Sequence, residues 1–165
     1  MSGSCHFAID AHDEYPATAA ASVDTGIGAF NDIAAPLHEV APVACFARRN
    51  DGTVIGGAIG RRWGKCCEVQ QLWVDESHRR QGIGVALMRA FESRAREHGC
   101  EDFFLETFSF QAPDFYRALG YVTVHKNDLF PHGIVKHLMF KRTSGAADAA
   151  PEAGSDQVAT LPRTK

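Results

Sequence analysis

The sequence lacks the residue spacings that are typical of a metal site or a disulfide framework. Its five cysteines are an odd number without CxxC spacing, and its eight histidines form neither HxxxH nor HExxH pairs. Cys66 and Cys67 are neighbours, so in a strand their side chains would point to opposite faces, which suits neither a chelate nor a bridge. We therefore expect free thiols, no bound metal ion and a reducing, cytoplasmic environment.

A membrane segment and a strong net charge are also missing. The N-terminal residues have no cationic stretch followed by an apolar one, so no signal peptide is expected, and no apolar run approaches the ~20 residues that span a bilayer. The formal charge is only −3 at pH 7, and the basic pairs are scattered along the chain. These features argue against membranes and nucleic acids as partners.

What is present predicts one globular domain. The chain has 165 residues, of which 45% are hydrophobic and 22% charged, enough to bury a core. After residue 142 the composition changes to Ala, Gly, Ser, Pro and acids, with almost no large apolar side chain. We expect the domain to span residues 1–142 and residues 143–165 to form a disordered tail.

The apolar patterns predict an α/β fold with a mixed sheet of six or seven strands. Strands are expected at residues 5–10, 43–48, 53–60, 65–74, 100–108, 121–125 and 136–141. The glycines at 56, 57 and 60 indicate a bulge or a close backbone neighbour. One or two short helices are expected in residues 17–35, which Gly26 and Gly28 would break, and another short helix begins near Pro113.

Residues 69–99 form the segment around which the rest is organised. An apolar strand leads through a charged loop and two glycines, Gly82 and Gly84, into an amphipathic helix that ends at Gly99. One face of that helix is apolar: Ile83, Leu87, Ala90, Phe91 and Ala95. The other face is polar: Arg89, Glu92, Ser93, Arg96 and Glu97. A strand, a glycine loop and a helix in this order turn free N–H groups and the helix dipole toward one point, which predicts an anion site. The next strand should run parallel to the first through a right-handed crossover.

Two motifs add a resemblance to this reading. Residues 79–84, RRQGIG, resemble the R/Q-x-x-G-x-G/A signature of the GNAT superfamily of N-acetyltransferases, and residues 115–121, FYRALGY, resemble the family's F-Y-x-x-x-G-F/Y segment. With the elements between them, the resemblance covers about residues 66–124. It implies a GNAT-type mixed sheet flanked by helices, in which the strands before and after the central helix splay to form a wedge for coenzyme A.

The resemblance also implies acetyl-CoA as a co-substrate and names its binding residues. The pyrophosphate would lie on the loop, and the pantetheine arm would pair with the preceding strand. The implied contacts are Leu72, Trp73, Val74, Arg79, Arg80, Gln81, Gly82, Ile83, Gly84 and Val85. Where family members often carry an asparagine seven residues before the tyrosine, this chain has Ser109, whose hydroxyl would have to make the contact.

Acetyl transfer to an amine requires a deprotonated nucleophile, donors for the oxyanion and a proton for the leaving thiolate. The resemblance implies Tyr116 as the proton donor, and we expect the N–H of Trp73 or Val74 to meet the oxyanion. For the base, Glu68 comes first, because it lies fourteen positions before Gly82, the spacing seen in histone-acetylating members. Glu106 on the neighbouring strand comes second, and a chain of water molecules third.

The predicted function is N-acetylation of a small-molecule amine by direct attack on acetyl-CoA, carried out by a monomer or a homodimer. Two alternatives stay open. The chain could be a non-catalytic acyl-CoA-binding module that regulates a partner, or it could acetylate protein lysines or N-termini.

Overall fold

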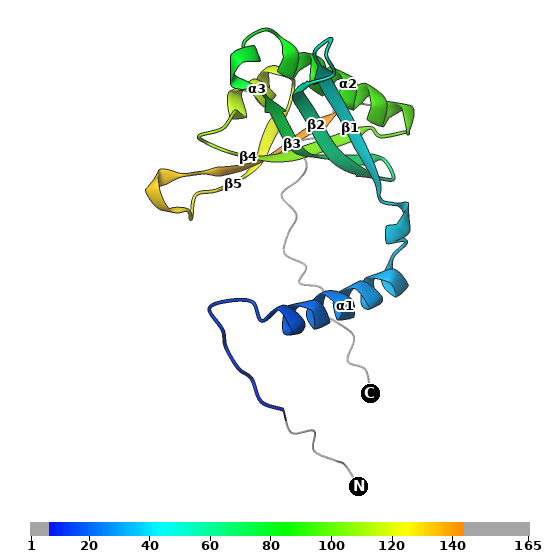
Figure 1. Cartoon of the computed structure of the whole chain (residues 1–165), viewed down its shortest axis with the longest axis vertical. Helices are drawn as coiled ribbons and strands as arrows, with labels where there is room; N and C mark the ends of the chain where they lie inside the picture. The colour runs from blue at the N-terminus through cyan, green and yellow to red at the C-terminus, as the bar shows by residue number, and fades with distance from the viewer. Residues whose placement is uncertain (1–6, 144–165) are drawn as a thin grey trace.

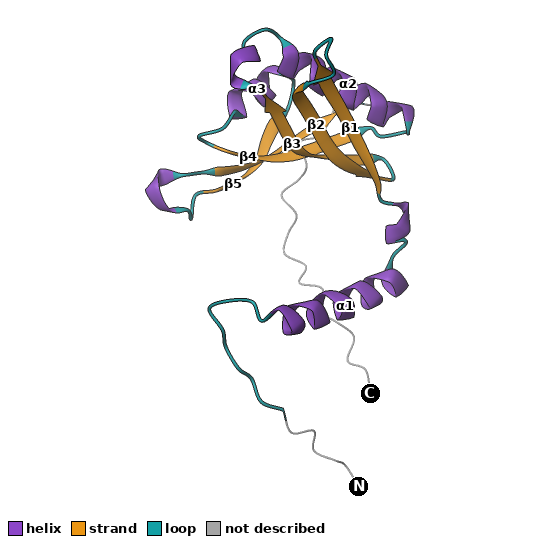
Figure 2. Cartoon of the chain, viewed as in Figure 1, coloured by secondary structure: helices purple, strands orange, loops and turns teal. Residues whose placement is uncertain are grey.

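A computed structural model describes residues 7–143 of the chain as one mixed sheet with helices (Figure 1). The strands are β1 (Ala41–Arg48), β2 (Val54–Trp63), β3 (Cys66–Val74), β4 (Asp102–Phe108), β5 (Val122–Asn127) and β6 (Lys136–Arg142). The α-helices are α1 (Ala17–Ala34), α2 (Ile83–Glu97) and α3 (Pro113–Ala118). Short 3-10 turns follow as η1 (Leu37–Glu39), η2 (Glu76–His78) and η3 (Pro131–Gly133) (Figure 2).

The sheet has the order β1-β2-β3-β4-β6-β5. β1, β2 and β3 are antiparallel, and β4 is parallel to β3 after the crossover through α2, as predicted. β6 then inserts between β4 and β5 and is antiparallel to both, an order that hydrophobic patterns alone do not specify. The strand expected at residues 5–10 is wrong for residues 7–10, which have no regular structure, and its first two residues lie outside the described range.

One face of the sheet is covered by α2. The buried side chains of this helix include Leu87, Met88, Phe91 and Ala95, in one cluster with inward-facing residues of the strands. Gly60 makes this close approach feasible: a Cβ there would lie 2.8 Å from the Phe91 ring and 1.9 Å from the Glu68 carbonyl oxygen. The β2–β3 register also shifts between Ile59 and Gly60. Both expectations for these glycines, a bulge and a close neighbour, are confirmed.

Glu92 corrects the predicted polar face of α2. It is buried, and its carboxylate accepts hydrogen bonds from the Tyr121 hydroxyl (3.0 Å), Lys141 Nζ (2.8 Å) and Arg96 (2.8 Å). Ala90, assigned to the apolar face, is exposed. A buried carboxylate is tolerated when it is paired and hydrogen-bonded, and two of these partners, Lys141 on β6 and Tyr121 just before β5, are far from Glu92 in the sequence. Helical periodicity could not reveal them.

α1 stands apart from the packed part of the molecule. It is one continuous helix of 18 residues, so the predicted break at Gly26 or Gly28 is wrong. Alanine has the highest helix propensity, and four of the first five residues of α1 are alanines, which offsets the low propensity of the two glycines. No residue of α1 is buried, and Figure 1 shows the helix on the side of the sheet opposite α2, at a distance from it. The predicted tail lies outside the described residues apart from Thr143, whose N–H donates to the Glu101 carbonyl (2.9 Å).

Candidate active site

β3 and β4 diverge partway along their length. They pair from Cys66 opposite Asp102 to Val69 opposite Leu105, and then both continue without pairing to each other. A bulge in β3 accompanies the divergence, because Gln70 is skipped in the register with β2. β4 stays paired with β6 along its whole length, so its backbone is bound on one side only beyond the divergence. The splay implied by the family resemblance is therefore present.

The backbone groups at the end of β3 alternate in direction. The Asp75 N–H donates to the Ile55 carbonyl (2.9 Å), which marks a hydrogen-bonded pair of the antiparallel ladder. By alternation the amide and carbonyl of Trp73 point toward β2, and those of Leu72 and Val74 point toward β4. The Trp73 amide is thus engaged in the sheet, contrary to its expected availability for an oxyanion, and of the two candidate amides only that of Val74 points away from β2.

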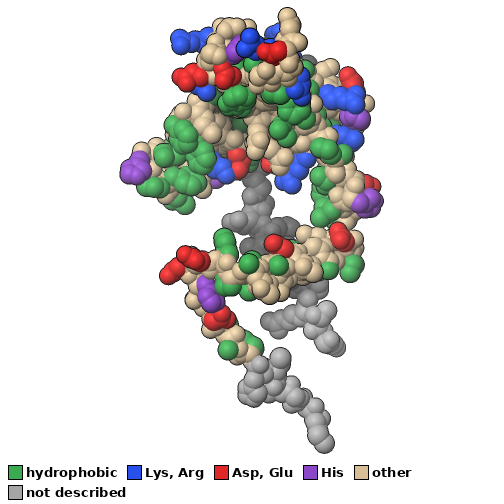
Figure 3. Space-filling model, viewed as in Figure 1, with side chains coloured by type: hydrophobic (Ala, Val, Ile, Leu, Met, Phe, Trp, Pro, Cys, Tyr) green, Lys and Arg blue, Asp and Glu red, His purple; other side chains and the backbone are tan. Residues whose placement is uncertain are grey.

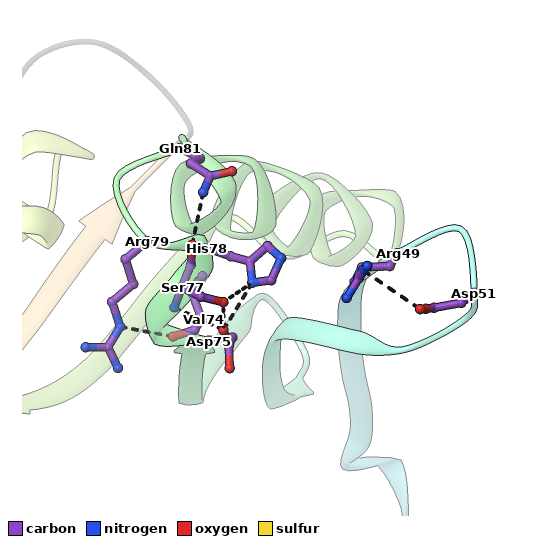
Figure 4. A network of polar contacts seen from close by, with 8 residues as sticks. All are labelled: Arg49, Asp51, Val74, Asp75, Ser77, His78, Arg79 and Gln81. Carbon is purple, nitrogen blue, oxygen red and sulfur yellow. Dashed lines mark hydrogen bonds and ion pairs between the residues drawn. The ribbon is translucent and has the colours of Figure 1, made fainter.

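The loop that follows β3 is held by its own side chains (Figure 4). The Asp75 carboxylate accepts from the Ser77 N–H and His78 Nδ1, both at 3.0 Å, and from the Ser77 hydroxyl. These contacts, with Ser77 first, lower the pKa of the Asp75 carboxyl. Gln81 donates to the Ser77 carbonyl (3.2 Å), and Arg79 Nε donates to the Val74 carbonyl (3.1 Å). The loop is therefore pre-shaped by internal contacts.

At the end of this loop, several backbone amides are free. Arg80 and Gly82 both adopt left-handed conformations, with φ of 61° and 80°. The first hydrogen bond of α2 runs from the Ala86 N–H to the Gly82 carbonyl (3.0 Å), and the amides of residues 81–85 donate to no described residue. Free amides at the positive end of a 15-residue helix form an anion-binding site in chemical terms. The Arg80 guanidinium is exposed and makes no ion pair with the described residues, so it can add a positive charge.

α3, which carries Tyr116, packs next to this helix end. The Tyr116 ring contacts Phe115 and Tyr121 edge-on, with centroids 5.2 and 6.0 Å apart. A Cβ at Gly84 would lie 3.4 Å from the Phe115 ring, so α3 packs against the first turn of α2. Tyr116 is 9% exposed, and burial raises the pKa of its phenol. The hydroxyl, which makes no hydrogen bond within the described chain, therefore keeps its proton at neutral pH.

Both carboxylates considered as bases are paired with cations. Glu68 forms a 2.6 Å ion pair with Arg61, and Glu106 pairs with Lys136. The Glu68 side chain is 23% exposed and that of Glu106 52%. Glu68 also lines a cavity of about 370 Å³. Because its neighbours Cys67 and Val69 face α2, Glu68 emerges on the opposite face of the sheet from Tyr116.

Ser109 makes two hydrogen bonds within the protein. Its N–H donates to the Val135 carbonyl (2.7 Å), and its hydroxyl oxygen accepts from the Val135 N–H (3.1 Å). These two bonds tie the end of β4 to the segment before β6. One hydroxyl hydrogen is left to donate to a ligand.

His137 is a candidate functional residue that the sequence patterns did not single out. It is buried on the α2 side of β6, and its Nδ1 has no hydrogen-bond partner within the described residues. Burial first, and then the charges of Arg117 and Lys126, lower the pKa of the imidazole, so it is neutral at pH 7. The alternation of KHLMFK places His137 on the same face as Met139, which was the available signal.

Residues 7–143 contain neither a metal-binding cluster nor a membrane-spanning helix. No three His, Cys, Asp or Glu side chains there gather closely enough to hold a metal ion. Across the same residues, none of the helices has the length and apolarity needed to cross a membrane.

Comparisons with known proteins agree with this geometry. The profile of the acetyltransferase (GNAT) family matches residues 9–121. A blasticidin-S acetyltransferase from Streptomyces morookaense is 39% identical over 109 residues, which are 66% of this chain and 78% of that protein. A crystal structure of an acetyltransferase from Bacillus cereus ATCC 14579 is 27% identical with a TM-score of 0.68, covering 81% of this chain and 97% of that one. An aminoglycoside 6'-N-acetyltransferase complexed with coenzyme A shares the fold at 18% identity and a TM-score of 0.56, over 65% of this chain and 76% of that one. The chain therefore belongs to the acetyltransferase (GNAT) family.

Proposed function

We propose that this acetyltransferase moves the acetyl group of acetyl-CoA to an amine of a small molecule by direct attack. The observation that carries the proposal is the divergence of β3 and β4 directly beside the free amides at the start of α2. An extended, amide-containing ligand that ends in a pyrophosphate matches both features. The solved fold relative that contains coenzyme A supports the same ligand.

The residues present fit that ligand. The amides of residues 81–85 and the unpaired Arg80 would hold the pyrophosphate, since they offer N–H donors and positive charge at a helix N-terminus. The amide and carbonyl of Leu72 on the β4 side would pair with the pantetheine arm, whereas Arg79 already occupies the Val74 carbonyl. Trp73 would contribute its exposed side chain rather than its backbone. Ser109 would donate its one remaining hydroxyl hydrogen.

Proton transfer would be divided between two faces of the sheet. When bound, the coenzyme supplies the acetyl group as a thioester. Tyr116 holds a proton at its hydroxyl near the start of α2 and would give it to the departing sulfur. The N–H of Val74 would donate to the carbonyl oxygen as negative charge develops there.

Glu68 is the first choice for the base. It lines the cavity on the other face, is more buried than Glu106, and can reach an incoming amine from that side. Arg61 Nε donates to its carboxylate at 2.6 Å and fixes its position, from which it would accept a proton directly or through water. Glu106 is the second choice, and a water chain the third.

The acceptor class rests on the relatives. The blasticidin-S acetyltransferase match spans 78% of that protein, and it supports a small-molecule amine over a protein acceptor. Blasticidin S is therefore the first compound to test, followed by aminoglycosides and simple polyamines.

The test is a thiol-release assay with acetyl-CoA across this panel, combined with calorimetric measurement of coenzyme binding. Tyr116→Phe should lower kcat by about 10²–10⁴-fold with coenzyme affinity unchanged, because only the proton donor is lost. Tyr15→Phe is the matched control, since Tyr15 is 94% exposed and away from the site. Full activity of Tyr116→Phe at every pH would refute the acid role. Coenzyme binding without turnover of any amine would favour the non-catalytic module, and turnover of lysine or N-terminal peptides alone would favour a protein acetylase.

A further inference from the structure

α1, called the arm from here on, carries an apolar stripe that touches nothing buried. The stripe consists of Ala20, Val23, Ile27, Phe30 and Ala34, spaced alternately by three and four residues. Val23, Ile27 and Phe30 are 69%, 53% and 66% exposed. The hydroxyls of Ser22 and Thr25 bond to carbonyls four residues back on the opposite side of the helix. A helix of this length owes most of its stability to burial of such a stripe, which the other residues of the described range 7–143 leave uncovered.

The body of the protein has an uncovered apolar surface of its own. This surface, the open face, is the side of β1 and β2 that points away from α2, and it carries Phe46, Ile59 and Trp63. They are 50%, 38% and 42% exposed. The Phe46 ring lies over β2, since a Cβ at Gly57 would be 2.9 Å from it. Figure 1 shows α2 and α3 on the other side of the sheet and no described helix lying against this one. Contiguous exposed apolar groups of this kind mark interaction sites.

The charges of the arm and the body are complementary. Residues 7–40, which include the arm, contain six carboxylates, two of them on the arm itself, and no Lys or Arg, whereas residues 41–142 contain fifteen Lys and Arg against eleven Asp and Glu. In Figure 3 the charged side chains visible along the arm are acidic, and the basic ones lie on the body. Arg48 and Arg61 stand on the open face itself, Arg48 at 5.7 Å from the Phe46 ring centroid. Opposite charges would steer the arm to this surface.

The segment that connects the arm to the body indicates whether the arm on an open face comes from the same chain or from a second copy. Leu37 and Val40 of the connecting segment already line the cavity on their own body, together with Trp63 and Phe104. α1 precedes this segment in the chain and lies away from its own sheet (Figure 1). A second copy of the chain has no such constraint on where it presents its arm.

We propose that two copies of the chain exchange their arms, each laying its stripe on the open face of the other. Stripe and open face belong to the same chain, so a two-fold axis satisfies both surfaces of both copies at once. The exchanged arm would lie beside the cavity that contains Glu68, which places a partner helix at the edge of the acceptor side. This inference is independent of the proposed chemistry, because it concerns only how the chains associate.

The experiment measures the molar mass of the full chain by light scattering over a dilution series. Wild type should be a dimer. Ile27→Asp should raise the dissociation constant by roughly 100-fold or more, because each dimer would bury two unpaired carboxylates. Ile33→Asp is the matched control: it makes the same change on the same helix, at a residue that is 90% exposed and off the stripe, and it should leave the dimer intact. Circular dichroism should show both variants folded, since neither residue is buried.

Ile59→Asp tests the open face and should dissociate the dimer as Ile27→Asp does. Mixing the two dissociated variants gives the sharper test. In a mixed pair, the intact arm of the Ile59→Asp chain meets the intact open face of the Ile27→Asp chain, so a heterodimer should reappear with one of its two contacts restored. A monomeric wild type would overturn the proposal, as would a dimer insensitive to Ile27→Asp. A dimer broken by Ile27→Asp but not by Ile59→Asp, with no heterodimer on mixing, would also overturn it and indicate pairing between arms.

Discussion

The two faces of the sheet differ in how they are covered. On one face α2 packs into the strands so closely that Gly60 has no room for a Cβ. On the other face Phe46, Ile59 and Trp63 are exposed, and α1 stands away from them with its own apolar stripe uncovered. One face of the sheet is therefore buried by folding of a single chain. The other face would be buried only when a second copy binds to it.

The same division runs through the proposed active site. Tyr116 belongs to the α2 side and Glu68 to the open side, so the proton donor and the first-choice base are separated by the sheet. The divergence of β3 and β4 is what allows a ligand to be reached from both. The packed face would therefore hold the coenzyme, and the open face would receive the acceptor.

The largest expected effect is the difference in stability between an aliphatic-to-alanine substitution on α2 and one on α1. Leu87→Ala on α2 should lower the free energy of unfolding by about 2–5 kcal/mol, because Leu87 is 4% exposed and a cavity would remain. Ile33→Ala on α1 should change it by less than about 0.5 kcal/mol, because that side chain is in water. Urea titration of both variants measures the difference. Equal losses would show that α1 is packed as firmly as α2.

Glycine substitutions should show a smaller difference between the two faces, with destabilisation on the α2 side and none on α1. Gly60→Ala should cost about 1–3 kcal/mol, since the added methyl group would overlap the Glu68 carbonyl and the Phe91 ring. Gly26→Ala meets nothing within 4 Å and should make α1 more helical by about 1 kcal/mol. The urea midpoint reports the first change, and hydrogen exchange of the α1 amides reports the second. A Gly60→Ala protein of wild-type stability would contradict the close packing.

The smallest effect is a difference in pH dependence between two neighbouring thiols. Burial raises the pKa of Cys67, on the α2 side, from 9.0 to about 12, and it also raises the pKa of Cys66, on the open side. Above pH 9 the unfolded chain loses a proton that the folded Cys67 keeps, so stability falls as pH rises from about pH 9 to about pH 12.

Cys67→Ala should therefore flatten the decline in unfolding free energy between pH 9 and 11 more than Cys66→Ala does. Urea titrations at several pH values give these slopes. If Cys66→Ala had the larger influence, the assignment of the two thiols to the covered and open faces would be wrong.

Much of the fold could be predicted because its signals are local. Alternating apolar residues identified the six described strands, and residues 69–99 indicated a strand, a glycine loop and a helix before any family was considered. Gly82 in that segment marks a left-handed backbone at the helix start, with φ of 80°, and Gly84 leaves space for the Phe115 ring. The positions of Tyr116 and the loop followed from the motifs.

Other features depend on partners that are distant in the sequence. Glu92 was predicted to be exposed because it follows the polar period of α2, but Tyr121 and Lys141 meet it only when β5 and β6 are in place. Trp73 was a plausible oxyanion donor until the pairing of β3 with β2 showed which way its amide points. The burial of His137 under the same sheet also needed the tertiary structure.

The sequence by itself determined the central unit, its anion-binding loop and the chemical groups available beside it, because these depend on residues close together in the chain. Only the tertiary structure decided which groups share a face, where β3 and β4 part, and that none of the other described residues buries a side chain of α1. Those properties depend on strand order and on contacts between distant segments, which no local pattern encodes.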